Sequence, residues 1–372
     1  MELILDYLLY AFLAVAAINT LYYIFFLKFA FAKAYTQKKP SLNLPVSLIV
    51  CSKNEADNLR KHIPLWLAQD YPDFQLVLIN DSSRDETGDV IESFQHKDDR
   101  IKVVTVQNNE TFWASKKYAL TLGIKAAAHE HLLFTDADCA PDSKNWLRKM
   151  TRHFENNKMV VLGYGGYTTS KNRYLDKLIK FETIITALQY FSYALWGNPY
   201  MGVGRNMAYT KKLFFEHNGF IKHMNIHSGD DDLFVNEAAT NKNSAIEISK
   251  EAHTWSEPKH TFAAWFLQKR RHISTATRYS VKDQVLLGLF FGTQLLFLIG
   301  AIGMSIIAHH ILWVLIAIGA RYFFAWLAVG LGAHRLGEKS SIVYFPVLEL
   351  FLVFFQITIF NSNLISKPNH WK

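Results

Sequence analysis

The fold of this chain is decided by residues 131–139, which read His131-Leu132-Leu133-Phe134-Thr135-Asp136-Ala137-Asp138-Cys139. The continuous apolar run 132–134 predicts a short buried strand in a sheet that is covered by helices on both faces. Asp136 and Asp138 follow two residues apart, and side chains at i and i+2 of an extended backbone point the same way. We therefore expect two carboxylates side by side at the carboxyl end of a strand, where open α/β sheets bind ligands.

Paired carboxylates repel each other, and a cation beside them relieves that repulsion. Their hard oxygen ligands suit Mg²⁺ or Mn²⁺, which such sites share with substrate phosphates. Asp136 and Asp138 are therefore candidate metal ligands. A surface turn after the strand is the alternative, because aspartate also favours turns. This stretch alone leaves both interpretations open.

Composition indicates a membrane-associated chain rather than one that binds nucleic acid. The 372 residues are 19% charged and 50% hydrophobic, a low charge content for a soluble protein, and the apolar residues gather at the two ends. The net charge of +8 suits anionic partners such as a nucleotide or an acidic membrane surface. The sequence contains no long run of lysine and arginine of the kind that would indicate a nucleic-acid partner. The two cysteines form no metal-like pair, so we expect a reduced setting for the middle of the chain.

The beginning of the chain has the character of a membrane anchor. Residues 3–32 are almost uncharged and long enough to span a hydrocarbon core of about 30 Å. We predict an N-terminal transmembrane helix within 1–33 and a linker over 34–45. The start is not basic and no small-residue cleavage site follows, so a cleaved signal peptide is not expected. Lysines after residue 27 place the following residues in the cytoplasm by the positive-inside rule.

The last third of the chain turns apolar again. Basic residues flank the apolar stretches of this region, and the positive-inside rule places those basic residues in the cytoplasm. Together with the first apolar segment, these stretches predict a multi-pass protein of the cell membrane whose central domain lies in the cytoplasm. Arg321 lies within a stretch and should face other helices or water. Glu349 interrupts the last stretch, which leaves an interfacial position open for it. The predicted C-terminal membrane region, 283–366, contains three helices, at 285–308, 311–333 and 342–365.

Strand and helix patterns alternate between the membrane segments. Such alternation predicts an α/β fold with a mostly parallel sheet, and we assign residues 46–275 to this domain. Within it, residues 173–200 predict an amphipathic helix on the protein or on the membrane interface, with packing in the core as the alternative. Buried strands are predicted at 46–50, 75–79, 101–106 and 131–135. Three helices are predicted between them: one ends near residue 69, the next begins near residue 85, and the third covers 115–128.

Acidic residues follow three of the predicted strands, at the edge where a doubly wound sheet brings strand ends together. Glu55 follows the first strand, Asp81 and Asp85 the second, and the 136/138 pair the fourth. Carboxylates at strand ends can accept hydrogen bonds from a ribose or a base. Neither GxGxxG nor GxxxxGK[ST] occurs, so a metal and basic side chains would hold phosphates. Any one of these acids, Asp85 in particular, could instead cap a helix.

Two later motifs carry further chemistry. The stretch Ser228-Gly229-Asp230-Asp231-Asp232-Leu233 offers a general base, although acids also suit the positive N-terminus of a helix. In Gln268-Lys269-Arg270-Arg271-His272, the first, fourth and fifth residues share one face of a helix. That face could hold a diphosphate, because arginine binds phosphate oxygens with two parallel bonds. A basic cluster touching anionic lipid is the alternative.

In order and spacing, these motifs resemble those of the membrane-anchored, inverting family 2 glycosyltransferases of GT-A fold. That family includes cellulose, chitin and hyaluronan synthases and ceramide glucosyltransferase, and the resemblance runs from about residue 44 to 275. Residues 79–85 look like the family's Val-Asp-Asp-Gly-Ser-x-Asp, with Asn80 and Ser82 as departures. Residues 115–121 resemble Gly-Lys-x-x-Ala-Leu-Asn, which makes Lys116 the counterpart of the family lysine.

The remaining motifs continue the resemblance. Asp136-Ala137-Asp138 is similar to the Asp-x-Asp metal motif, and residues 204–209 resemble the Gly-x-Asn-x-Ala segment at the acceptor side. Gly229-Asp230-Asp231 stands where the family has Gly-Glu-Asp. Residues 268–272 resemble Gln-x-x-Arg-Trp, with His272 in place of the tryptophan.

The resemblance implies a metal-dependent glycosyltransferase, with Mg²⁺ or Mn²⁺ as cofactor. Its donor would be a nucleotide-diphospho-sugar, expected to be a UDP-sugar, and its acceptor a lipid or lipid-linked glycan at the membrane. The reaction would be a single displacement with inversion, with Asp231 as the catalytic base and Asp136 and Asp138 as the metal ligands. The residues implied to bind the donor are Glu55, Asp81, Asp85, Lys116, Asp136, Gln268 and Arg271.

Three other functions remain open. Four spans are few for a polysaccharide conduit, which favours glycolipid synthesis over a processive polysaccharide synthase of the same family. A catalytically silent membrane scaffold that binds nucleotide-sugar is a second alternative, and the intact Asp138, Asp231 and Arg271 argue against it. A nucleotidyltransferase would share the sheet and the metal but would release pyrophosphate.

Overall fold

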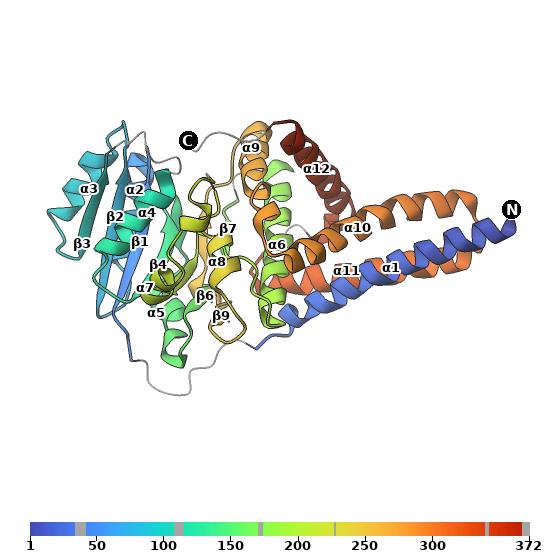
Figure 1. Ribbon diagram of the computed structural model, residues 1–372, viewed down its shortest axis with the longest axis horizontal. Coiled ribbons are helices and arrows are strands. Elements are labelled where there is room, and N and C mark those ends of the chain that lie inside the picture. Colours follow the sequence, from blue (N-terminus) through green and yellow to red (C-terminus); the bar gives the residue numbers. More distant parts are fainter. Residues whose placement is uncertain (34–41, 108–114, 170–173, 227, 339–341, 367–372) are drawn as a thin grey trace.

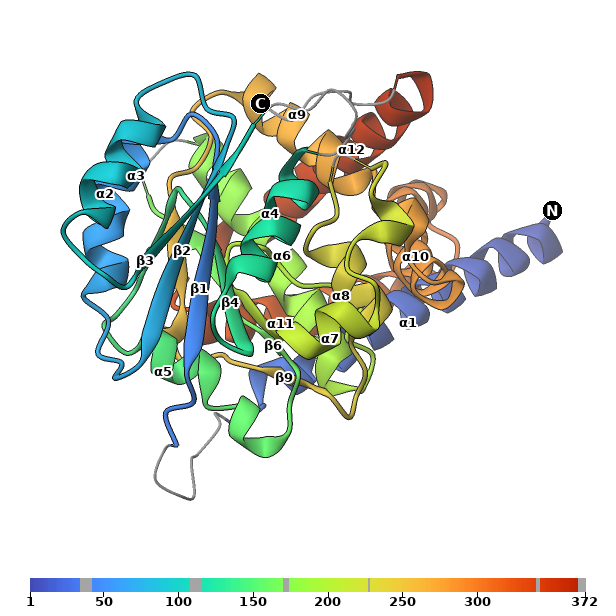
Figure 2. The ribbon, with the colours of Figure 1, turned by 60° about the vertical axis from the view of Figure 1, so that its left-hand side comes forward.

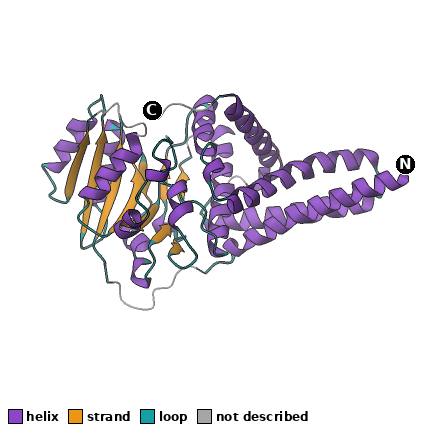
Figure 3. Cartoon of the chain, in the orientation of Figure 1, coloured by secondary structure: helices purple, strands orange, loops and turns teal. Residues whose placement is uncertain are grey.

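A sheet of seven strands lies at one end of the molecule, and apolar helices extend from the other end (Figures 1 and 3). The computed structural model describes residues 1–33, 42–107, 115–169, 174–226, 228–338 and 342–366, so most of the predicted linker over 34–45 falls outside the described residues. The strands of the main sheet, in spatial order, are β3 (Ile101–Val106), β2 (Phe74–Asp81), β1 (Val46–Ser52), β4 (His131–Asp136), β8 (Met207–Thr210), β6 (Val160–Leu162) and β9 (Ser244–Ile246).

The sheet is mostly parallel, as the alternating pattern predicts. Among the described strands of this sheet, only β8 runs against its neighbours. A second, smaller sheet contains β5 (Cys139–Pro141), β10 (Thr254–Ser256) and β7 (Gly165–Tyr167). The α/β fold class is therefore confirmed.

Helices cover both faces of the parallel strands. In Figure 2, α2 (Ala56–Leu67) and α3 (Thr87–Gln95) lie on one side, and α4 (Ser115–Ala126) lies on the other. Successive residues of β4 enter different cores, because side chains alternate along a strand. Leu133 packs in the same cluster as Trp66 of α2, whereas Leu132 and Phe134 pack in the cluster that contains Leu120 of α4. This two-sided burial is why β4 reads as a continuous apolar run.

The backbone after β4 differs from the predicted extended path. The strand ends at Asp136, residues 137 and 138 form a turn, and β5 begins at Cys139. The extended backbone expected from Asp136 to Asp138 is therefore not observed, and the turn that was the alternative forms here. The turn arises because the chain leaves the main sheet here and joins the smaller one, where β5 pairs with β10.

Helix α6 (Tyr174–Leu195) occupies most of the segment for which an amphipathic helix was predicted. It contacts α1, α11 and α12 of the helical region as well as β7 and β9 of the sheets. Its polar residues Asp176 and Lys180 are buried together with its apolar ones. The helix thus packs in the core, between the sheet domain and the apolar helices.

Within the described residues, four helices are long and apolar enough to cross a membrane: α1 (Glu2–Ala30), α10 (Val281–Ile307), α11 (Ile311–Arg335) and α12 (Phe345–Ile365). The first three contact one another and extend together away from the sheet (Figure 1). Helix α12 instead lies across the base of this bundle, beside α6 and α9 (Phe262–Ile273). This arrangement favours the interfacial position for α12. If α1, α10 and α11 cross a membrane, α12 runs in a different direction from them and would not cross it alongside them.

A buried polar network joins the four apolar helices. Arg321 of α11 is fully buried, and it faces other helices as predicted. Its guanidinium donates to Glu349 of α12 at 2.7 Å and to Asn19 of α1 at 2.9 Å. Tyr23 and Gln294 each donate to the same glutamate at 2.9 Å. The acid that interrupts the last apolar stretch is therefore the partner of the buried arginine.

Breaking this pair should destabilise the bundle strongly. Arg321→Leu leaves the Glu349 carboxylate buried without its cation, which typically costs about 3–5 kcal/mol, and the melting temperature in detergent should fall accordingly. The double variant Arg321→Leu/Glu349→Leu removes both charges and should recover most of that loss. Equal melting temperatures for the single variant and the wild type would show that the pair does not hold the helices together.

Candidate active site

Three parallel strands bring acidic residues to one edge of the sheet. Cys51 of β1 lies opposite both Ile79 of β2 and Asp136 of β4 in the strand registers, and Asp81 is the last residue of β2. Burial raises the pKa of the Cys51 thiol, and the nearby charges of Asp81, Asp230 and Asp136 raise it further, whereas Lys116 opposes them. The structure therefore gathers two predicted strand-end acids, Asp81 and Asp136, and Asp230 of the later acidic stretch around one point.

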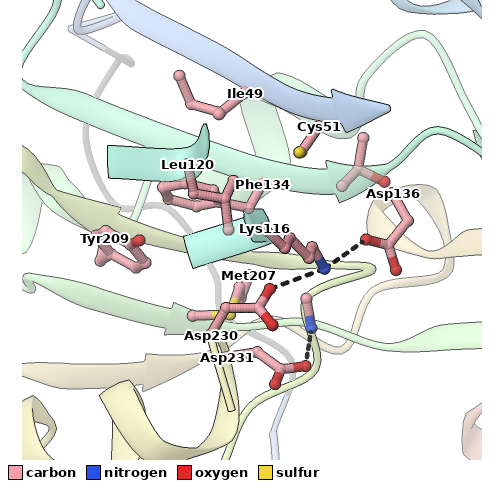
Figure 4. Close-up of a pocket in the computed structure, with 12 residues that line it drawn as sticks. Ile49, Cys51, Lys116, Leu120, Phe134, Asp136, Met207, Tyr209, Asp230 and Asp231 are labelled. Atoms are coloured by element: carbon pink, nitrogen blue, oxygen red, sulfur yellow. Dashed lines mark hydrogen bonds and ion pairs between the residues drawn. The ribbon is translucent and has the colours of Figure 1, made fainter. Parts of the chain in front are cut away.

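Lys116 lies at the centre of this group. Its ammonium is 3.3 Å from Asp136 and 2.8 Å from Asp230, so it bridges the Asp-x-Asp motif and the later acidic stretch (Figure 4). Burial alone would lower the pKa of Lys116, but Asp136, Asp230 and Asp231 together raise it well above its ordinary value. The lysine is thus a fixed positive charge in a pocket that is also lined by Asp231 and Gly204.

Asp231 is held in this pocket as an acceptor. Its Oδ2 accepts the backbone N–H of Gly204 at 2.7 Å, and its Oδ1 accepts the N–H of Asp232 at 2.8 Å, at the N-terminus of α8 (Asp232–Ala238). Burial and the charges of Asp230 and Asp232 raise the pKa of Asp231 to about 7, although Lys116 and the Gly204 N–H oppose the shift. A carboxylate with this pKa exchanges protons near neutral pH, as a general base must.

The three consecutive acids of this stretch have three different surroundings. Asp230 pairs with Lys116, which together with local hydrogen bonds lowers its pKa despite burial. Asp232 is a buried anchor that accepts hydrogen bonds from the hydroxyls of Thr275 and Tyr279. Only Asp231 combines a raised pKa near neutrality with a place in the pocket. Its contact with the first turn of α8 also bears out the helix-terminus interpretation.

Asp136 and Asp138 form a donor set that fits a hard divalent cation. Burial raises the pKa of Asp138, and the charges of Asp136 and Glu55 raise it further. Mutual repulsion of this kind is what a bound cation relieves, and carboxylate oxygens are the ligands that Mg²⁺ and Mn²⁺ prefer. The Arg205 guanidinium opposes the shift, and it stacks on the Tyr167 ring at 4.2 Å.

Asp85 is placed differently from the predicted nucleotide-facing acids, whereas Glu55 lies near the 136/138 pair. The Asp85 carboxylate accepts the backbone N–H groups of Thr87 at 3.1 Å and Ala56 at 3.3 Å, so it joins the start of α3 to the start of α2. Burial opposes a shift, but these hydrogen bonds lower its pKa. The helix-capping alternative therefore describes Asp85. Glu55 accepts a hydrogen bond from Asn58 at 2.6 Å and lies close enough to Asp138 to affect its pKa.

Helix α9 carries the predicted Gln268 and Arg271. Its neighbour Arg270 donates to Asn363 and Ser366 at the end of α12. Lys269 forms an ion pair with Glu182 of α6. Basic residues of this helix thus fasten it to other helices, which the lipid-contact interpretation does not describe.

His272 replaces the tryptophan of the resembling motif at the end of α9. The pKa of His272 lies well below its ordinary value. Loss of solvent around the ring disfavours its charged imidazolium form and lowers the pKa. The positive charges of Lys269, Arg271, Arg205 and Lys116 lower it further. The imidazole is therefore neutral at physiological pH, and this end of α9 lies beside the pocket.

Three groups of the pocket region were not predicted as site residues. Asp230 lay in the acidic stretch, but nothing in the sequence distinguished it from its neighbours. The Gly204 N–H and Arg205 belong to the segment 204–209, whose resemblance to an acceptor-side motif was the available signal. Arg205 donates to the backbone of Gly166 at 3.0 Å and to Ser256 at 3.1 Å, contacts that only the folded chain reveals.

The chain has recognisable relatives. Residues 47–220 match the family model described as glycosyl transferase family 2. The match covers the first part of the predicted α/β domain. The chain is 29% identical over 143 residues to the uncharacterized glycosyltransferase EpsJ of Bacillus subtilis, and the match covers 38% of this chain and 40% of that protein. It is 25% identical over 175 residues to a poly-β-1,6-N-acetyl-D-glucosamine synthase of Staphylococcus epidermidis, covering 46% and 41%.

The chain thus matches less than half the length of these curated relatives. Among solved structures it is similar to the mannosyltransferase PcManGT from Pyrobaculum calidifontis in complex with GDP-Man and Mn²⁺. The TM-score is 0.60 and the identity 15%, and the match covers 89% of this chain and 98% of that one. At this identity the likeness concerns the fold, and it confirms the predicted GT-A fold with its apolar helices.

Proposed function

We propose that the enzyme transfers a sugar from a nucleotide-diphospho-sugar to a lipid or lipid-linked glycan at a membrane. The proposal rests on one observation: the Lys116 ammonium lies within 3.3 Å of the carboxylates of both Asp136 and Asp230. Asp136 belongs to the motif that resembles Asp-x-Asp, and Asp230 precedes the proposed base in the later acidic stretch. Donor and acceptor chemistry therefore meet in one pocket. A UDP-sugar is the expected donor, although the structural neighbour is bound to GDP-Man.

The donor would lie along the carboxyl ends of β1, β2 and β4. Asp136 and Asp138 would hold Mg²⁺ or Mn²⁺, an assignment supported by their mutual repulsion and by the Mn²⁺ in the complex of the structural neighbour. When bound, such an ion neutralises charge that develops on the leaving diphosphate. Asp81 and Glu55 would face the nucleoside, and Lys116 supplies a fixed positive charge on the diphosphate side.

The transfer step would be a single displacement. Asp231 accepts the proton of an acceptor hydroxyl, and the hydroxyl oxygen forms a bond to the anomeric carbon. The bond from that carbon to the diphosphate oxygen breaks, and the nucleoside diphosphate leaves with the electron pair. Attack from the face opposite the leaving group inverts the anomeric centre. The two backbone N–H groups on Asp231 support this role, because they fix the carboxylate and limit how far its pKa rises.

Gln268 and Arg271 would hold the diphosphate or the acceptor beside this pocket. The helix that carries them is fastened to α12, since the Trp265 ring stacks on Phe355 at 4.2 Å. An acceptor reaching this site from a bilayer crossed by α1, α10 and α11 would be a lipid. By the positive-inside rule, we place the catalytic domain at the cytoplasmic face of the cell membrane.

A processive polysaccharide synthase is the second candidate function. The similarity to a poly-β-1,6-N-acetyl-D-glucosamine synthase favours it. Product length separates the two candidates, because a processive enzyme yields long chains at an early stage of the reaction, whereas single transfer yields one sugar per acceptor.

Nucleotide release tests the proposed function. Purified protein with Mn²⁺ and a panel of UDP- and GDP-sugars should release nucleoside diphosphate when membrane lipid is supplied, and one donor should stand out. A nucleotidyltransferase would release pyrophosphate, and a silent scaffold would bind a donor without turnover. Either result would overturn the proposal.

The pH profile should report the ionisation of Asp231. With a pKa of about 7, the base is ionised above that pH, so kcat/KM should rise about tenfold between pH 6 and pH 8. Asp230→Asn removes a charge that raises this pKa, so its acidic limb should move to lower pH even if its maximal rate falls. A limb that stays in place or moves upward in this variant would contradict the assignment.

A further inference from the structure

A cluster of metal-ligating side chains lies at the end of the helical bundle away from the sheet, near the N-terminus in Figure 1. Asp6 comes from the beginning of α1, and His309 and His310 from the short turn that joins α10 to α11. Each side chain offers one ligand atom, and these atoms all lie within 4.8 Å of one another. Residues more than 300 positions apart in sequence thus converge on one point.

The spacing of these atoms suits a tetrahedral ion. His309 Nε2 lies 2.7 Å from Asp6 Oδ1, and His310 Nε2 lies 3.8 Å from the same oxygen. Ligand atoms placed about 2.0–2.1 Å from a tetrahedral Zn²⁺ are separated by about 3.3 Å, a value between these two distances. Small movements of the two rings, without a change in the backbone, would therefore complete such a site.

The turn between α10 and α11 directs both imidazoles toward the carboxylate. Ala308 and His310 have left-handed backbone conformations, with φ of 56° and 47°, and the two rings meet edge to face at 4.3 Å between centroids. The His309 side chain is 19% exposed and that of His310 57%, so one ligand is largely enclosed and the other faces outward. An ion bound here would keep contact with solvent.

We propose that Asp6, His309 and His310 bind a divalent ion of the zinc and copper class, which fastens the beginning of α1 to the α10–α11 turn. Two imidazoles and one carboxylate favour Zn²⁺, Cu²⁺ or Ni²⁺ over Mg²⁺ and Ca²⁺, which prefer oxygen ligands alone. The site is separate from the proposed catalytic pocket, whose candidate ligands Asp136 and Asp138 supply only oxygen. This chemical difference allows the two sites to be told apart.

Electron paramagnetic resonance of bound Cu²⁺ tests the proposal. The full chain, purified in detergent without a polyhistidine tag and stripped of metal, receives one equivalent of Cu²⁺ in excess Mg²⁺. We expect coupling from two imidazole nitrogens, and a large excess of Zn²⁺ should lower this copper signal by competing for the same ligands. His309→Ala and His310→Ala should each lose one nitrogen coupling and weaken binding at least about tenfold, because even residues that merely orient a ligand contribute that much.

Two further variants make the test decisive. His334→Ala, an exposed histidine at the opposite end of α11, should leave the spectrum unchanged. His310→Ala is the main test variant, since its exposed side chain can be removed with little risk to folding. Absence of nitrogen coupling in the wild type, or an unchanged spectrum in His310→Ala, would overturn the proposal. The contact between His309 and Asp6 would then be an ordinary ion pair.

Discussion

Replacing Asp231 with asparagine should lower sugar transfer by about 10²- to 10⁴-fold, the range over which a positioned general base accelerates a reaction. The acceptor hydroxyl would lose the group that takes its proton. Donor binding should remain close to that of the wild type, because Lys116 reaches Asp136 and Asp230 rather than this carboxylate. Initial rates of nucleoside diphosphate release, with donor affinity measured separately by calorimetry, check both expectations.

A matched control is available on the surface of the same domain. Asp89→Asn makes the same chemical change at an exposed position of α3 and should leave the rate unaltered. A rate for Asp231→Asn within a few-fold of this control would remove Asp231 from the catalytic role. The identity of the base would then have to be sought elsewhere in the pocket.

Asp138→Asn should lose at least about a hundredfold in transfer, because metal-ion stabilisation of a leaving group contributes several kcal/mol and each 1.36 kcal/mol is tenfold. The defect should appear mainly in the response to the cation, so higher Mn²⁺ concentrations should restore part of the activity. The variant should melt no lower than the wild type, since the change removes a carboxylate whose charge is disfavoured by burial and by Asp136. Activity titrations against Mn²⁺, together with melting curves, separate lost ligation from lost folding.

Chelation provides the complementary measurement on the wild type. Removal of divalent ions with EDTA should abolish transfer, and Mn²⁺ or Mg²⁺ should restore it. Full activity in EDTA, or an unchanged Mn²⁺ response in Asp138→Asn, would show that the 136/138 pair does not hold a required cation.

The parallel sheet was predictable because each of its central strands carries its own signal. Residues 132–134 form an apolar run since they are buried on both faces, and the sequence displays that directly. The turn after Asp136 was not predictable in the same way. It depends on the pairing of β5 with β10, two strands more than a hundred residues apart. Local patterns contain no information on such a pairing.

The candidate site divides along similar lines. Asp136, Asp138 and Asp231 lie in recognisable motifs, so the sequence was sufficient to propose them as candidate site residues. The ion pair between Lys116 and Asp230 could not be predicted, because the two residues are 114 positions apart and meet only where α4 and the acidic stretch come together in the fold. Asp85 shows the reverse case, since its motif indicated a nucleotide contact whereas its carboxylate accepts two backbone N–H groups.

The helical region shows how far composition can reach. Length and apolar content indicated four segments, and the structure has four matching helices. Composition could not indicate that α12 lies across the other three, because that placement follows from specific contacts. The pairing of Arg321 with Glu349, and the stacking of Trp265 on Phe355, hold α12 in this position.

Joint measurement of both products tests the account most directly. The purified enzyme receives Mn²⁺, a donor labelled in its sugar, and a membrane lipid extract, and the released nucleotide and the labelled lipid are quantified together. We expect one nucleoside diphosphate for each labelled sugar that enters the lipid fraction, and at least about a hundredfold less of both products with Asp231→Asn. Release of pyrophosphate, or donor binding without either product across the UDP- and GDP-sugars, would contradict it.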